Sequence, residues 1–213
     1  SFIDLTGVPG DLTKRARAIR ARVNQWIGIP TCIGIAPTKT LAKLANHIAK
    51  QAERKPGSYP AELAQVADLS RLPEDELDAL LAATSVGEVW GVGRRIGEQL
   101  KAQGVATALD LKRMSPAAAR AGWSVIFERT VRELQGESCV DLEDVAPAKQ
   151  EIACTRSFGS AVRDLDELTE AVSEFSARAA QKLRRQSGVT SQILVFIRTS
   201  PFRQTPQYSR SLV

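Results

Sequence analysis

Residues 34–50 read GIAPTKTLAKLANHIAK, and this stretch decides the fold of the first part of the chain. With Pro37 and Thr38 as turn and N-cap, it predicts a helix over roughly residues 38–54. At about 100° per residue, its apolar side chains fall within about a third of the circumference. They are Leu41, Leu44, Ala45, Ile48 and Ala52.

The opposite side of this helix carries a basic stripe within about 80° of arc. The stripe consists of Lys39, Lys43, His47, Lys50 and Arg54. It contains no acidic residue that could form i,i+4 ion pairs, so like charges four residues apart repel each other. A phosphate-rich ligand would relieve that repulsion, and an ordinary solvated helix face is the alternative interpretation.

Before this helix, the chain predicts a strand, a helix and a second strand. Residues 2–6 predict the first strand, and residues 29–36 predict a second one that pairs with it. Asp11 is the expected N-cap of a helix through Ile27. Its apolar stripe comprises Leu12, Ala16, Ile19, Val23, Trp26 and Ile27. This α/β layer is incomplete and starts at Ser1 without Met, so we expect a fragment.

The middle of the chain predicts a small all-α domain. Two prolines and a glycine within residues 55–60 predict a boundary. Residues 62–123 show short helical patterns with tight turns and no convincing strand, and a further helix leads to Gly136. Residues 137–147 are acidic and aperiodic, which predicts a linker.

The last block predicts a β-α-β unit. Residues 152–159 and 189–199 are the expected strands, and residues 166–186 are the expected helix. The tail to Val213 is too short to complete a sheet. The apolar stripe expected on the helix comprises Leu168, Val172, Phe175, Ala179 and Leu183.

Composition narrows the function classes. The chain has 213 residues, 43% hydrophobic and 25% charged, which excludes a disordered polar tail. Its longest uncharged stretch, residues 23–38, is interrupted by proline and glycine, which excludes a membrane span. Three cysteines without a Cys-x-x-Cys pair and one histidine argue against disulfide frameworks, histidine triads and His-rich metal sites. The net charge of +5 divides into +7 for residues 1–55, −5 for 56–150 and +3 for 151–213, which favours a polyanionic partner.

Residues 89–95 read VWGVGRR between helical patterns, and Gly104-Val105 follows. This pattern is typical of a helix-hairpin-helix. Glycines let the backbone of the turn approach a phosphate, and the next helix offers its free N–H groups. Arg94 and Arg95 add charge at the same place. Such contacts hold nucleic acid by its backbone and read no sequence, whereas a plain turn is the alternative.

Catalytic carboxylates are the gap in this pattern. Two-metal phosphoryl transfer requires several convergent carboxylates. Asp4 is the only acid near a strand end in the α/β part, and Asp11 is better explained as a cap. The residues by themselves therefore predict a nucleic-acid binder without a complete active site.

Four motifs occur in order along the chain: FIDLTG from Phe2, GIAPTKTLAKLAN from Gly34, VWGVGRR from Val89 and CTRSFG from Cys154. The segment ERTVRELQGE from Glu128 is a fifth. Together they resemble the Y-family translesion DNA polymerases, and the likeness is strongest to the bacterial SOS mutagenesis subgroup. The resemblance covers nearly the whole chain.

The resemblance implies an α+β multidomain right-hand polymerase. Residues 1–57 would be the end of a partial α/β palm, and residues 58–137 a small all-α helix-hairpin-helix thumb. Residues 138–150 would be a linker, and residues 151–213 an incomplete β-α-β little finger. The family's catalytic Asp-Glu pair and an earlier Asp lie upstream of Ser1, so we expect no catalytic or metal-binding residue in this chain.

The resemblance also implies ligand positions. Lys50 matches the family lysine that contacts the incoming triphosphate, and Lys39 and Lys43 match neighbouring basic positions. The hairpin and the little finger would hold the DNA backbone, the latter partly through the strand expected at 193–199. The residues implied in DNA binding are Gly91, Val92, Gly93, Arg94, Arg95, Arg156, Ser157 and Arg198.

By the same resemblance, the full-length protein would extend a primer opposite damaged template bases with low fidelity. Two Mg²⁺ ions, held upstream of Ser1, would assist the transfer. The implied partners are primer-template DNA, deoxynucleoside triphosphates, a processed SOS accessory dimer, the recombinase filament and the sliding clamp, with no membrane. The implied location is the cytoplasm of a bacterium, at the nucleoid.

Two other function classes stay open. One is a catalytically inactive, polymerase-like accessory protein. The other is a non-enzymatic helix-hairpin-helix DNA-binding module. In either case, and for a polymerase too, we expect this fragment alone to add no nucleotide.

Overall fold

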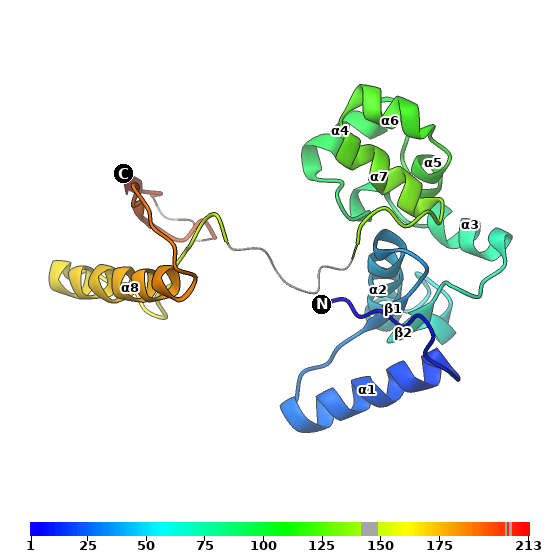
Figure 1. Ribbon diagram of the computed structural model, residues 1–213, viewed down its shortest axis with the longest axis horizontal. Coiled ribbons are helices and arrows are strands. Elements are labelled where there is room, and N and C mark those ends of the chain that lie inside the picture. Colours follow the sequence, from blue (N-terminus) through cyan, green and yellow to red (C-terminus); the bar gives the residue numbers. More distant parts are fainter. Residues whose placement is uncertain (142–148, 203, 205) are drawn as a thin grey trace. The chain divides into compact units, whose positions relative to one another are not determined.

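The structure is a computed structural model and describes residues 1–141, 149–202, 204 and 206–213. It has two compact units, Ser1–Glu143 and Asp144–Val213, each of which is described by itself (Figure 1). The first unit contains α1 Leu12–Ile27, β1 Ile33–Ile35, α2 Lys39–Arg54, η1 Ala61–Leu63, β2 Val66–Asp68, α3 Glu74–Ala82, η2 Val86–Glu88, α4 Arg94–Ala102, α5 Ala108–Lys112, α6 Pro116–Gly122 and α7 Val125–Leu134. The second contains α8 Leu165–Arg185, β3 Val195–Arg198 and β4 Ser209–Leu212.

A two-stranded parallel sheet, β1 beside β2, separates α1 from α2 (Figure 1). Side chains alternate across a strand. Ile35 and Val66 therefore pack with Ala16 of α1, whereas Ala67 lies in the core cluster of α2. Gly34 also faces α2, and a Cβ there would lie 2.3 Å from the Ala42 carbonyl oxygen. Only glycine permits this close approach of β1 to α2.

The amphipathic helix predicted from residues 38–54 is confirmed as α2. Thr38 is its N-cap, and the Thr38 side chain accepts a hydrogen bond from Leu41 N. The apolar face is buried as predicted and joins residues of α3 to α7 in one hydrophobic cluster. The five predicted core residues are all buried: Leu41, Leu44, Ala45, Ile48 and Ala52.

The buried carboxylate of Glu133 joins α7 to the first turn of α2. Its oxygens accept hydrogen bonds from the backbone N–H of Thr40 at 2.8 Å, Cys139 at 3.1 Å and Val140 at 3.0 Å. The Thr38 hydroxyl donates to the Glu133 carbonyl oxygen at 2.8 Å. Since the Glu133 residue is 0% exposed, these donors replace all of its hydration.

The helix predicted to follow Asp11 is confirmed as α1, with Asp11 as N-cap and Gly28 in the left-handed conformation as C-cap. Only half of its apolar stripe packs against the rest of the unit. Ala16 is buried and Leu12 and Val23 are half-buried, but Ile19 is 50% exposed, Ile27 is 64% exposed and Trp26 is 72% exposed. The sheet of two short strands packs with Leu12 and Ala16, in the amino-terminal half of this 16-residue helix, and leaves much of the stripe beyond them uncovered.

The strand predicted for residues 2–6 is wrong. These residues have no regular secondary structure apart from a turn that starts at Thr6. β1 pairs instead with β2, which lies inside the region expected to lack strands. A strand needs a hydrogen-bonded neighbour, and the described chain offers residues 2–6 none. β2 has three residues, too few to show an alternating pattern in the sequence.

The middle of the chain forms short helices, as predicted. α3 begins after Pro73 with three acids, Glu74, Asp75 and Glu76, in its first turn. α5 to α7 follow closely, and the helix expected before Gly136 is α7. Residues 1–57 and 58–137 contribute to one core, and their assignment to palm and thumb stays a prediction. The expected linker, 138–150, partly lies outside the described residues, which omit 142–148.

The second unit has an α-β-β order in place of the predicted β-α-β. The long helix is confirmed as α8, with Asp164 as N-cap and its apolar stripe half-buried. The strand expected at 152–159 is wrong: the Ala153 carbonyl accepts a bond from Lys182 Nζ at 3.0 Å, and no strand pairs with this segment in the described residues. The strand expected within 189–199 is the shorter β3. It pairs antiparallel with β4, a strand that was not predicted from the sequence.

Replacement of Glu133 by Gln is expected to lower the free energy of unfolding by about 2–4 kcal/mol, because the amide NH₂ faces N–H donors and leaves buried groups unpaired. Glu137→Gln is the control, since Glu137 is exposed and pairs with Arg132 at the surface. Its effect should be below about 1 kcal/mol. Urea unfolding followed by circular dichroism measures both, and equal effects would contradict the role given to Glu133.

Candidate nucleic-acid interface

The basic stripe of α2 lies on its exposed side, as predicted. Lys43, Lys50 and Arg54 are exposed and have no ion-pair partner in the part of the chain that the structure describes. The fold gives one member an acidic neighbour from another element: His47 Nδ1 lies 3.3 Å from Glu88 Oε2 of η2. The stripe therefore keeps most of its positive charge available to a ligand.

The amino end of α2 meets two segments that are distant in sequence. Lys39 is half-buried, and its ammonium donates a hydrogen bond to the carbonyl oxygen of Asp141. Lys39 Nζ and Lys43 Nζ each lie 5.5 Å from the ring centroid of Phe2. The Phe2 ring centroid also lies 5.7 Å from the ring centroid of Trp90. Trp90 belongs to the glycine hairpin, which is the turn of residues 89–93 between η2 and α4.

Glu133 changes what the amino end of α2 can bind. The first turn of a helix offers N–H groups and positive dipole to an anion. Here the protein's own carboxylate occupies one of these groups, Thr40 N–H, and the Thr38 side chain caps another, Leu41 N–H. A phosphate near α2 must therefore be bound mainly by lysine side chains.

The glycine hairpin leads into a helix whose amino end is open. Gly91 has a φ of +92°, which favours glycine, and Val92 is buried. Gly93 is the N-cap of α4 and provides no side-chain cap. The first helix expected in the helix-hairpin-helix is a single 3₁₀ turn, η2. Among these elements, α4 offers the uncapped backbone N–H groups that suit a phosphate.

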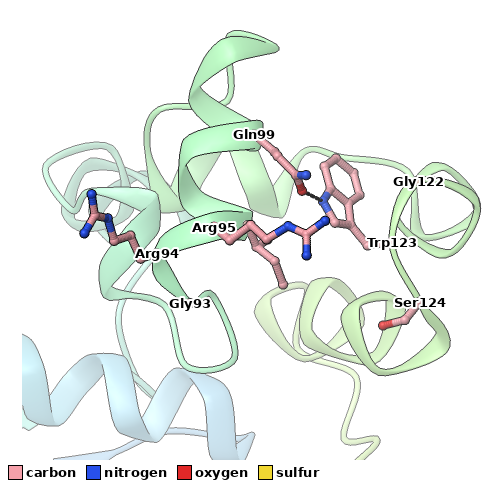
Figure 2. A pocket seen from close by; sticks show the side chains of 8 residues that line it. Gly93, Arg94, Arg95, Gln99, Gly122, Trp123 and Ser124 are labelled. Atoms are coloured by element: carbon pink, nitrogen blue, oxygen red, sulfur yellow. Dashed lines mark hydrogen bonds between the residues drawn. The ribbon is translucent and has the colours of Figure 1, made fainter. Parts of the chain in front are cut away.

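A pocket of about 570 Å³ opens beside the amino end of α4. Figure 2 shows the Arg95 side chain directed toward the Trp123 indole, whose Nε1 donates to Gln99 Oε1 at 3.1 Å. Arg94 points to the other side and pairs with Glu98 at 2.9 Å. The lining residues are Gly93, Arg94, Arg95, Ile96, Gln99, Gly122, Trp123 and Ser124. Gln99, Trp123 and Ser124 were not predicted from the sequence, although an aromatic residue at a break between two helices is a usable signal.

The three DNA-binding residues predicted in the second unit are exposed, but the structure does not bring them together into one site. Arg156 and Ser157 lie on an irregular segment. Arg198 is exposed at the end of β3, opposite Ser209 of β4. No described contact joins Arg198 to Arg156 or Ser157.

The acids and thiols form no reactive centre in the described chain, where no three His, Cys, Asp or Glu side chains lie close enough to hold a metal ion. Hydrogen bonds from Thr6 lower the pKa of Asp4 below its ordinary value, which keeps this single carboxylate ionised. Burial raises the pKa of the Cys32 thiol above its ordinary value, and the neighbouring Glu53 carboxylate raises it further. Cys32 therefore stays protonated and is a poor nucleophile.

Within the part of the chain that the structure describes, none of the helices combines the length and the apolar composition that a membrane-spanning segment requires.

Arg95→Gln should weaken the binding of a primer-template duplex to the 213-residue chain about fivefold and reduce its salt dependence by about one unit of log Kd per log salt. Lys101→Gln, at the other end of α4, is the matched control and should change affinity less than about twofold. Fluorescence anisotropy at several salt concentrations measures both. A larger effect from Lys101 than from Arg95 would exclude this end of α4 as the interface.

Comparison with known proteins gives a consistent match. Residues 149–213 match the model of the impB/mucB/samB family C-terminal domain, and residues 1–47 match the model of the impB/mucB/samB family. Protein UmuC of Salmonella typhimurium is 48% identical over 99% of this chain and 49% of its own length. DNA polymerase IV of Alkalilimnicola ehrlichii is 23% identical over 96% of this chain and 54% of its own length.

Among solved structures, the insertion ternary complex of Dbh DNA polymerase aligns with a TM-score of 0.49 and 15% identity, over 98% of this chain and 55% of that one. The chain spans about half the length of the curated relatives it matches. The two family matches together cover more than half of the chain and include its first and last residues. The chain therefore belongs to the impB/mucB/samB family, within the Y-family that its motifs resemble.

Proposed function

We propose that this chain is part of an error-prone translesion DNA polymerase of the SOS response, similar to the catalytic subunit of bacterial DNA polymerase V. One observation carries the proposal. The basic stripe of α2, in which Lys43, Lys50 and Arg54 have no ion-pair partner among the described residues, and the open amino end of α4 are two features suited to phosphate. They belong to the same compact unit and are linked through Phe2 and Trp90. A polymerase must bind a triphosphate and a DNA backbone next to each other.

The stripe of α2 is assigned to the incoming triphosphate. Lys50 and Lys43 are exposed, and Lys39 is half-buried about one turn before Lys43. Because Glu133 occupies the amino end of the helix, recognition relies on ammonium groups, which act as point charges. Residues 1–57 would then be the end of the palm.

The hairpin and α4 are assigned to the backbone of the DNA, within a thumb of residues 58–137. Gly91, Val92 and Gly93 shape the turn, and Arg95 adds charge beside the pocket. Neither feature selects a base, so binding would follow phosphate charge and duplex shape. Arg156, Ser157 and Arg198 would add backbone contacts from a little finger of residues 151–213.

Nucleotide transfer would require Mg²⁺, which neutralises the departing pyrophosphate. The described residues do not fit a Mg²⁺ site, because no group of three candidate ligands occurs among them. We assign no transfer step to this chain and propose that the ligands belong to the longer protein. An SOS accessory dimer, a recombinase filament and a sliding clamp are the further partners proposed for that protein.

The test is primer extension on a template with an abasic site. The longer protein should incorporate nucleotides with Mg²⁺ and none without it, whereas the 213-residue chain should bind the same primer-template and incorporate none. Incorporation by the 213-residue chain would refute the assignment of the metal ligands to other residues.

The same assay separates the two alternatives. Binding without incorporation by the longer protein would indicate an inactive, polymerase-like accessory protein. Binding that is equal for primer-template and unrelated duplex ends, again without incorporation, would indicate a helix-hairpin-helix module that acts only as a DNA-binding scaffold.

A further inference from the structure

Phe2 is the residue at which the two proposed phosphate sites meet. Its ring centroid lies 5.5 Å from Lys39 Nζ, 5.5 Å from Lys43 Nζ and 5.7 Å from the Trp90 ring centroid. Phe2 is half-buried and Trp90 is 42% exposed. The contact between Phe2 and Trp90 therefore lies at the surface, and burial in the hydrophobic core does not explain it.

The Phe2 ring offsets charge repulsion within the basic stripe. Lys39 and Lys43 are four residues apart on one helix, so their ammonium groups repel each other. The face of an aromatic ring carries partial negative charge and attracts a cation within about 6 Å of its centroid. One ring that attracts both ammonium groups opposes their separation and restricts two long, flexible side chains.

An ammonium group near a ring still has N–H donors to offer, because lysine carries three. Lys43 has no other polar partner in the described chain, and Lys39 uses one donor on Asp141 O. Both groups can therefore bind a phosphate chain while they remain beside Phe2. A lysine that is already restrained loses less side-chain entropy when it binds.

The contact with Trp90 extends this effect to the hairpin. Trp90 directly precedes Gly91, whose left-handed conformation starts the turn into α4. Phe2 itself belongs to the amino-terminal segment and lies in no strand. One ring thereby joins the triphosphate-facing lysines to the segment proposed to hold DNA.

We propose that Phe2 is a positioning residue for phosphate binding, which holds the Lys39 and Lys43 ammonium groups together and connects them to the hairpin through Trp90. This inference rests on the proposed function, since it concerns the lysines assigned to the triphosphate. Phe2 itself touches no phosphate. Its effect is on affinity and on the coupling between the two sites.

The experiment uses the 213-residue chain labelled with 5-fluorotryptophan, which gives one ¹⁹F resonance for each of its three tryptophans. Inorganic tripolyphosphate is the probe, and calorimetry at constant ionic strength gives its affinity. Phe2→Leu should weaken binding about fivefold, consistent with loss of exposed cation–π contacts. Phe2→Tyr retains the ring face and should stay within about twofold of the original chain.

The tryptophan spectra provide a readout that general destabilisation does not move. Tripolyphosphate should shift the Trp90 resonance in the original chain and leave it unshifted in Phe2→Leu. Trp26 of α1, whose ring centroid lies 5.0 Å from Arg22 Cζ and which belongs to neither proposed phosphate site, is the matched internal control and should not respond in either protein.

Two contrary results have different meanings. Equal affinity and an equal Trp90 shift in the original chain and in Phe2→Leu would overturn the role of Phe2 while the proposed function stands. Unchanged affinity in the double variant Lys39→Gln, Lys43→Gln would overturn the lysine assignment, and the role of Phe2 with it.

Discussion

The arrangement of the first unit depends on the carboxylate of Glu133, a charge with no exposed surface that is bound by three backbone N–H groups. These groups come from the first turn of α2 and from Cys139 and Val140, just after α7. A buried carboxylate is stable only when its hydrogen-bond partners are all in place. The contact therefore fixes the amino end of α2, with Lys39 and Lys43, relative to α7 and the helices that pack on it.

The same contact makes the two proposed phosphate sites of this unit chemically different. At α2, the protein's own carboxylate already occupies the anion position at the helix end, so the ammonium groups of the stripe are what remains for a ligand. At α4, the N-cap is a glycine without a side chain, and the backbone N–H groups remain open. The first arrangement suits a mobile, highly charged triphosphate, and the second suits a backbone that slides past without sequence readout.

An element could be predicted from the sequence where its interactions are local, and could not where they join segments that are distant in the chain. The helix at 38–54 has a strong 3.6-residue period and was predicted with its core residues, because a helix forms its hydrogen bonds locally. The predictions of strands at 2–6 and 152–159 were wrong, because a strand forms only where a distant segment pairs with it. Conversely, β2 was missed because three residues carry no pattern. α1 was correctly predicted as a helix, yet Trp26 is exposed since the sheet is too small to cover it.

The candidate site shows the same division. The lysine stripe and the glycine hairpin were visible as local motifs, whereas the residues that organise them were not. Glu133 contacts Thr40 across 93 positions of sequence, and Phe2 contacts Trp90 across a comparable span. Such pairs leave no periodicity or spacing to read in one sequence.

Amide hydrogen exchange of the 213-residue chain, with and without primer-template DNA, tests most directly whether the hairpin and α4 hold the DNA backbone. Exchange at residues 91–96, in the hairpin and the first turn of α4, should slow when DNA is bound. Unchanged exchange there, with protection confined to other elements, would contradict this role.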